Sequence, residues 1–268
     1  MSFLKRKANS ARRSPFAAAI VIALGLLLSG GGYAVASTVI STESGQSIDL
    51  KDPKNIDAGK KLFLANCASC HGVNASGSSA APSLIGVGAA SVHFQVGSGR
   101  MPAQASGPQM PTKTPQFSEE QTLQLAAYVA SLAPGPEIPS DEAVKANGDA
   151  TRGGQLFRTN CAMCHNAVGA GGALTEGKYA PALLDTEPKE IYEAMITGPQ
   201  NMPVFSDANL TPTDKKDIIT YLTYVQENRS PGGYELANLG PVAEGLFAWI
   251  FLLGLIIGIT VWLGAKSN

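Results

Sequence analysis

The chain has 268 residues and a formal net charge of −1 at neutral pH, which gives no support for a nucleic-acid partner. Its length allows two domains of ordinary size. The 29 glycines and 17 prolines, with few aromatic residues, favour loop-rich domains and count against large sandwiches or barrels.

Residues 1–37 combine a basic start with an apolar run. Five lysines and arginines precede an apolar segment of 21 residues from Phe16 to Ala36, which is typical of a secretory signal or a signal anchor. The strongly apolar part has 13 residues and suits a signal peptide cleaved near Ala36, whereas the whole segment suffices for a retained helix. Both interpretations stay open, and both place the residues after Ser37 outside the cytoplasm.

Two similar segments, here called domain 1 (residues 56–133) and domain 2 (residues 149–230), make up the middle of the chain. A polar linker is predicted at 38–55, and a linker rich in proline and acidic residues at 134–148. The stretch "GKKLFLANCASCH" in domain 1 and "GGQLFRTNCAMCH" in domain 2 agree at eight positions. Repetition of this kind indicates that both segments adopt the same fold.

Each domain is predicted to be all-α. A helix leads into a Cys-x-x-Cys-His motif, and a Gly-rich loop, a short helix and a Met-Pro loop follow it. A final helix is expected around 123–132 in domain 1 and 218–225 in domain 2, with Ser118 and Thr211 as cap residues. Loop-rich domains of about 80 residues bury little apolar surface and commonly need a cofactor, metal or disulfide for stability.

The four cysteines of the chain form two Cys-x-x-Cys pairs, and a histidine directly follows each pair. A zinc site needs four ligands, whereas each domain offers three, with an adjacent Cys and His badly placed for one tetrahedron. A thioredoxin-like redox pair needs a βαβ context, which the pattern does not indicate. Cys-x-x-Cys-His is the signature of covalent haem c attachment. We therefore predict two covalently bound haem c groups, held by Cys67, Cys70, Cys161 and Cys164, with His71 and His165 as iron ligands.

The sixth ligand of each iron decides its chemistry, because a methionine opposite the histidine raises the reduction potential and favours electron transfer. In domain 2 we predict Met202 of "TGPQNMP", 37 residues after His165. Met195 lies in the amphipathic run "EIYEAMITG" and is expected to pack in the core. The third histidine of the chain, His93, is expected to be a surface or half-buried residue.

Domain 1 contains two candidates for the sixth ligand, Met101 and Met110, each followed by proline. In domain 2, 21 residues separate Pro181 from Met202, while Met101 lies 19 residues after Pro82 and Met110 lies 28. The distance to the final helix points instead to Met110. We predict Met101 and interpret "AQASGPQM" as an insertion in domain 1, with Met110 left as the alternative.

A linker is predicted at 231–242 and a transmembrane helix at 243–265. The 21 residues from Gly245 onward are uncharged and cover the roughly 30 Å of a bilayer core. Trp249 and Trp262 lie towards the two ends, as interfacial anchors do. Neither apolar segment of the chain contains histidine, so these segments are expected to anchor the protein and not to bind haem.

Each domain resembles a class I cytochrome c, through "GKKLFLANCASCHG", "APSL", "GRMP" and their counterparts. Over residues 56–268 the chain resembles the dihaem cytochrome c subunit of the actinobacterial cytochrome bcc complex, most specifically in "GGALTEGKYAPAL", "AMITGPQNMP" and "LGPVAEGLFAWIFLLGLIIGITVWLGAK". In this fold type a carbonyl near Pro82 and Pro181 accepts a hydrogen bond from the iron-ligating histidine and fixes its orientation.

The resemblance implies an electron-transfer subunit of a menaquinol:cytochrome c reductase that is not catalytic alone. Electrons would pass from a Rieske iron–sulfur protein through the two haems to a terminal cytochrome c oxidase. The implied partners are a cytochrome b subunit, the Rieske subunit, the oxidase and membrane lipid. The haem domains would lie on the extracytoplasmic side of the cell membrane.

Two other functions stay open on the residues alone. A dihaem peroxidase would need an iron that is open to peroxide, which a Met-Pro loop in each domain counts against. A dihaem subunit of another respiratory oxidase or dehydrogenase would have the same haem motifs. Only the C-terminal tail and the partners would distinguish it from a reductase subunit.

Overall fold

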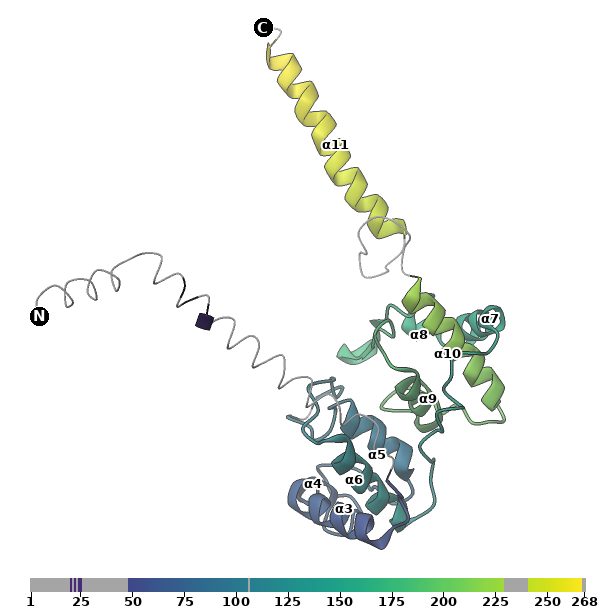
Figure 1. Ribbon diagram of the computed structural model, residues 1–268. Helices are drawn as coiled ribbons and strands as arrows, with labels where there is room; N and C mark the ends of the chain where they lie inside the picture. The colour runs from purple at the N-terminus through teal and green to yellow at the C-terminus, as the bar shows by residue number, and fades with distance from the viewer. Residues whose placement is uncertain are drawn as a thin grey trace, which may run out of the picture. The chain divides into compact units, whose positions relative to one another are not determined.

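Helices make up almost all regular structure in the part of the chain that the structure describes (Figure 1). The chain divides into two units, Met1–Ser47 and Ile48–Asn268. The predicted signal or anchor at 1–37, apart from four residues, lies outside the described part, as do most of the linkers predicted at 38–55 and 231–242. The computed structural model describes residues 48–105, 107–228 and 241–266, with Ile20, Ile22, Leu24 and Gly25.

The two domains repeat one order of helices. The described helices of domain 1 are α3 (Pro53–Asn66), α4 (Ala68–His71), α5 (Gly88–Gly97) and α6 (Glu119–Leu132), and α3 begins three residues earlier than the domain, within the predicted linker. Those of domain 2 are α7 (Ala150–Asn160), α8 (Ala162–His165), α9 (Pro188–Thr197) and α10 (Pro212–Glu227). Between α8 and α9, the antiparallel strands β1 (Gly172–Ala173) and β2 (Tyr179–Ala180) flank the short helix η1 (Thr175–Gly177). The mainly helical class is confirmed, and this small strand pair is an addition to it.

The final helix of each domain starts at a capping box, as predicted. In α6 the hydroxyl of Ser118 accepts the Gln121 N–H, and the Gln121 side chain accepts the Ser118 N–H. Thr211 and Asp214 make the same exchange at the start of α10. A cap of this kind is typically worth about 1 kcal/mol. The helices therefore begin at these caps, several residues before the apolar repeats that predicted them.

The first and last helices of each domain cross at a glycine. α3 packs on α6, and α7 packs on α10. A Cβ added at Gly59 would lie 1.8 Å from the Gln124 carbonyl oxygen, and one added at Gly153 would lie 1.9 Å from that of Asp217. No side chain fits at either crossing, which explains why both copies of the repeat have glycine there.

Each domain has its own hydrophobic core. Phe63 is 1% exposed in domain 1, and its ring centre lies 5.2 Å from that of Tyr128. Phe157 is equally buried in domain 2, with its ring centre 5.6 Å from that of Tyr221. Removing a buried phenylalanine ring typically costs about 3–5 kcal/mol. These equivalent pairs therefore hold the first and last helices together in both domains.

α11 (Pro241–Lys266) is a single apolar helix at the end of the described chain. Within the described residues, it is the one helix that is long and apolar enough to cross a membrane, over Gly245–Lys266. None of this stretch is buried inside the protein. An exposed apolar surface of this length is typical of a segment that contacts lipid or another protein. This agrees with the transmembrane helix predicted at 243–265.

Candidate functional site

The Cys-x-x-Cys-His motif folds in the same way in both domains. The Cys67 carbonyl accepts the N–H groups of the second cysteine and the histidine, at 3.1 and 3.0 Å. The Cys161 carbonyl does the same in domain 2, at 3.1 and 2.9 Å. Residues three and four apart share one face of a helical turn. Each motif therefore presents two thiols and an imidazole side by side.

The first cysteine of each motif is a neutral thiol at neutral pH. Burial, and then the charge of the second cysteine, raises the pKa of Cys67 and of Cys161 to about 11. A redox Cys-x-x-Cys pair works through a thiol of lowered pKa. The structure therefore favours a covalent attachment site over a thioredoxin-like function.

A proline carbonyl holds each histidine ring of the motifs. His71 Nδ1 lies 2.8 Å from Pro82 O, and His165 Nδ1 lies 3.0 Å from Pro181 O. When Nδ1 donates its proton to the carbonyl, the Nε2 atom of the ring is left as the metal-binding atom. Burial lowers the pKa of His165 against the opposing effect of the Pro181 bond. The ring is thus kept neutral, which is the form that binds a metal.

Glycine brings each proline within reach of its histidine. Gly77 has a φ of 85° and Gly171 a φ of 81°, in the left-handed region that favours glycine. A Cβ at Gly77 would lie 2.9 Å from the carbonyl carbon of Pro82, and one at Gly171 would lie 2.9 Å from that of Pro181. The Gly-rich loops after the motifs therefore position the prolines that the sequence pointed to.

The two methionine candidates of domain 1 lie in different surroundings. Met101 packs against the core of domain 1, and its N–H donates to Gln95 O at 2.8 Å. The Met110 backbone pairs instead with the Gln200 side chain of domain 2. Its N–H donates to Oε1 at 3.0 Å, and its carbonyl accepts from Nε2 at 3.1 Å. These contacts favour Met101 as the ligand of domain 1, which stays a prediction.

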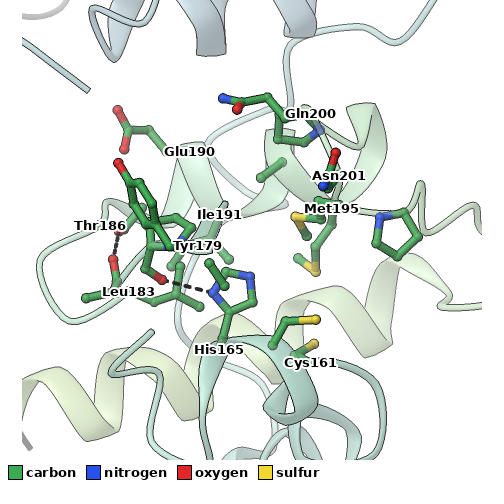
Figure 2. A pocket seen from close by; sticks show the side chains of 18 of the residues that line it. Cys161, His165, Tyr179, Leu183, Thr186, Glu190, Ile191, Met195, Gln200 and Asn201 are labelled. Carbon is green, nitrogen blue, oxygen red and sulfur yellow. Dashed lines mark hydrogen bonds between the residues drawn. The ribbon is translucent and has the colours of Figure 1, made fainter. Parts of the chain in front are cut away.

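A cavity of about 510 Å³ lies beside the motif of domain 2 (Figure 2). Cys161, Cys164, His165 and Met202 all line it. Met195, which is 2% exposed and packs in the domain 2 core as predicted, also reaches this cavity. Cofactor pockets commonly have volumes of this order. The structure therefore brings the predicted haem ligands of domain 2 together at one cavity.

Domain 1 supplies part of the wall of this cavity. α5 packs against α9, and the side chain of Gln109 accepts the Tyr179 N–H at 2.8 Å. The lining residues that come from domain 1 are Phe94, Arg100, Pro108, Gln109 and Thr112. The last three lie in or next to the insertion "AQASGPQM". The end of the insertion, at Pro108 and Gln109, therefore lies between the domains, against the cavity of domain 2.

The third histidine also lies between the domains. His93 is half-buried, with a side chain 12% exposed, and its Nε2 lies 3.1 Å from Glu119 Oε1. Its Nδ1 lies 2.7 Å from Oε1 of Glu193, a domain 2 residue whose side chain is 0% exposed. Burial alone would lower the pKa of His93, but the contacts and charges of the two carboxylates outweigh it and raise the pKa to about 9. His93 is thus a cation between two acids at neutral pH.

Sequence reasoning did not identify the residues that join the domains. Gln109, Gln200 and Glu193 were not singled out, because polar residues in loops and amphipathic helices carry no signal of their own. One signal was present: domain 2 has no counterpart of the stretch "AQASGPQM". A stretch that is present in only one copy of a repeat can make contacts that the other copy does not make. Here those contacts are with the other domain.

Both domains match models of c-type cytochrome families. Residues 56–133 match the family described as Cytochrome c. Residues 148–222 match the family described as Cytochrome C oxidase, cbb3-type, subunit III. The two matches cover the two helical domains, and both include a Cys-x-x-Cys-His motif, so covalently bound haem c agrees with them.

Known proteins are similar over nearly the whole chain. A "Cytochrome bc1 complex cytochrome c subunit" of Corynebacterium efficiens is 43% identical over 279 residues, covering 98% of this chain and 94% of the relative. A protein of the same name from Mycobacterium tuberculosis is 43% identical over 256 residues, covering 92% and 90%. The "Cbb3-type cytochrome c oxidase subunit FixP" of Sinorhizobium medicae is 32% identical over 125 residues, covering 43% and 40%. The last likeness extends over less than half of either chain.

Proposed function

The chain belongs to the family of cytochrome bc1 complex cytochrome c subunits, and from this premise we propose that it is a membrane-anchored dihaem cytochrome. Electrons pass from a Rieske iron–sulfur protein of a quinol:cytochrome c reductase, through two haems c, to a terminal cytochrome c oxidase. The chain is then an electron-transfer subunit of an oxidoreductase and is not catalytic alone.

One observation carries the proposal of two haems. The contact between a motif histidine and a proline carbonyl occurs twice, at 2.8 and 3.0 Å. In domain 2, a neutral thiol, a ring oriented through Nδ1 and a cavity lined by histidine and methionine fit a haem c. We propose thioether bonds from Cys67, Cys70, Cys161 and Cys164, and iron ligation by His71 with Met101 and by His165 with Met202.

The surrounding residues favour electron transfer over other haem chemistry. Haem c supplies reversible one-electron transfer when it is bound. The carbonyls of Pro82 and Pro181 orient the imidazoles and make them stronger ligands. As iron ligands, Met101 and Met202 would keep peroxide and oxygen from the iron and would raise its reduction potential. Both sites are therefore suited to relaying electrons and not to a peroxidase reaction.

We further propose that α11 anchors the protein in the cell membrane, with both haem domains on the extracytoplasmic side. The length and composition of Gly245–Lys266 support a span. The Nζ of Lys266 lies 4.6 Å from the centre of the Trp262 ring, a pair that suits the boundary between membrane and water. The basic residues at the start of the chain favour a cytoplasmic N-terminus.

The proposed partners are a cytochrome b subunit, a Rieske subunit, a cytochrome c oxidase and membrane lipid. The names of the most similar relatives reported above assign those proteins to a cytochrome bc1 complex. A second candidate function is a subunit attached to an oxidase alone, which the match of domain 2 to a cbb3-type oxidase subunit favours. In that case neither cytochrome b nor a Rieske protein would accompany the chain.

Affinity purification of the full chain from membranes in a mild detergent tests these two candidates. We expect a cytochrome b, a Rieske protein and oxidase subunits to be recovered together with the chain. Recovery of an oxidase without the other two would contradict the reductase proposal and establish the second candidate. A visible spectrum of the reduced protein that changes with carbon monoxide would reveal an open iron and favour peroxidase chemistry instead.

A further inference from the structure

Arg100 belongs to domain 1 but faces domain 2. In the sequence it stands directly before Met101, the proposed iron ligand of domain 1. Its side chain nevertheless lines the cavity of domain 2, together with His165 and Met202. Two consecutive residues therefore serve different sites: Met101 is the proposed iron ligand in domain 1, and Arg100 lines the cavity of domain 2.

The guanidinium of Arg100 is only partly paired. It lies over the ring of Phe94, 4.6 Å from the centroid, and its Nη1 atom is buried without a hydrogen-bond partner. Burial lowers the pKa of Arg100, and the charges of Glu190 and Tyr179 oppose that effect. Within the described part of the chain, however, no hydrogen bond or ion pair joins Arg100 to either residue.

A half-buried cation with a buried, unpaired donor needs an anion. Leaving such a donor unpaired costs about 1–3 kcal/mol, and more when the group is charged. Glu190 acts on the guanidinium through its charge alone, because no hydrogen bond or ion pair joins the two side chains in the described part of the chain. A guanidinium is shaped to bind a carboxylate through two parallel hydrogen bonds. The two propionates are the carboxylates that a haem would bring into this cavity.

Domain 1 holds this arginine firmly against domain 2. Gln109 accepts the Tyr179 N–H, and the Met110 backbone makes two hydrogen bonds with the Gln200 side chain. Within domain 1, the Lys113 ammonium donates to the carbonyl of Pro102, two residues after Arg100. These contacts fasten the residues that follow Arg100 to domain 2 and to one another.

From this geometry we propose that Arg100 binds a propionate of the haem in domain 2, so that domain 1 supplies the anion-binding residue for the haem of its neighbour. The inference rests on the proposed attachment of a haem to domain 2. A fixed positive charge near an iron favours its reduced form, because the ferric state carries one more positive charge. Arg100 is therefore a positioning residue that also raises the reduction potential of the second haem.

Arg100→Gln in the full-length, detergent-solubilised protein removes this charge and keeps a hydrogen-bonding side chain of similar shape. The reduction potential of each haem is followed by electron paramagnetic resonance of the ferric signals. Met101→His and Met202→His identify which signal belongs to which domain. We expect the domain 2 haem of Arg100→Gln to be about tenfold harder to reduce, a shift of about 59 mV for one electron. The domain 1 haem should be unchanged.

Two further variants separate a propionate contact from a general effect. Arg100→Lys keeps the charge but loses the paired donors, and should restore most of the potential. Arg158→Gln removes an exposed arginine of α7 in domain 2, and should shift neither haem. The potential of the domain 2 haem in Arg100→Gln should also become more dependent on pH near neutrality, because the released propionate takes up a proton more easily.

A shift confined to the domain 1 haem, or no shift in either haem, would overturn this assignment. An equal shift in Arg158→Gln would show that net charge alone is responsible, and would overturn it as well. Haem content, measured as pyridine haemochrome per chain, must match the unsubstituted protein for these comparisons. If the unsubstituted protein itself held fewer than two haems, the proposed function would fail, independently of any result for Arg100.

Discussion

Domains 1 and 2 share a fold, a motif and a proline contact, but their histidines have different surroundings. His165 is buried, whereas His71 is half-buried and Cys70 beside it is exposed. Residues of domain 1 also line the cavity of domain 2. Two copies of one sequence pattern therefore form unequal sites, because one copy serves as a wall for the other.

This inequality indicates a division of work between the two haems. A more open site allows a partner protein to approach the haem edge closely. An enclosed site excludes water and small molecules, and enclosure tunes the potential of the iron. We therefore expect the domain 1 haem to be the one that meets partners and small reagents more readily. Each of the following changes tests how far the two sites differ.

The largest expected effect is the loss of one haem. The paired changes Cys67→Ala with Cys70→Ala, and Cys161→Ala with Cys164→Ala, remove both thioether bonds from one domain at a time. Each double variant should keep about half of the covalently bound haem, measured as pyridine haemochrome per chain. An undiminished haem content in either variant would show that its motif does not hold a haem.

Methionine variants test whether the two domains use equivalent ligands. Met101→Leu should abolish the charge-transfer band of the Met–iron bond for one haem, whereas Met110→Leu should leave both bands intact. In domain 2, Met202→Leu should abolish the other band. Met195→Leu is the matched control. Exchanging side chains of similar volume should lower the stability by less than about 1.5 kcal/mol and should leave the charge-transfer band unchanged. Loss of a band in Met110→Leu alone would reassign the ligand of domain 1.

The repeat made the helices, caps and local contacts of both domains predictable from the sequence. Those features depend on spacing within one copy, and the second copy serves as a check. The contacts between the domains were not predictable. Glu193 is 0% exposed on a helix whose apolar pattern predicts a core, and its partner His93 is 100 residues away in the sequence. Periodicity identifies the face of a helix that is buried, but not the element that covers it.

The contact between α5 and α9 should make stability depend on pH. Glu119 and Glu193 face His93 directly, with Lys189 and Glu190 acting on them from α9. The pKa of His93 is raised from 6.5 to about 9 in the folded protein. The contribution of His93 to the free energy of unfolding is therefore complete below about pH 6.5 and is lost as the pH rises through about 9. We expect the free energy of unfolding to fall by about 3 kcal/mol over that interval.

His93→Gln should flatten this part of the pH profile, measured as the urea midpoint of the full chain in detergent. Lys61→Gln is the control, because Lys61 pairs with Asp57 on the surface, with side chains 76% and 63% exposed. A pair exposed to that extent contributes about 0–1 kcal/mol. A profile that stays as steep in His93→Gln would assign the pH dependence to other groups.

The smallest expected effect tests the wall of the domain 2 cavity. Gln200→Ala removes two hydrogen bonds to the Met110 backbone, each worth about 1 kcal/mol. The described end of the insertion, Pro108 and Gln109, should then leave the cavity up to about thirtyfold more often. Imidazole should displace the methionine of the ferric domain 2 haem faster by the same factor, as seen by stopped-flow absorbance.

The domain 1 haem provides the internal reference for this measurement, since the insertion does not form part of its predicted ligand set. Gln155→Ala, a change at an exposed glutamine of α7, controls for the loss of an amide side chain from domain 2. If Gln200→Ala accelerates imidazole binding at both haems alike, the effect is general loosening and the wall has no special role. If it accelerates binding at the domain 2 haem alone, the inequality of the two sites depends on contacts that domain 1 makes across the interface.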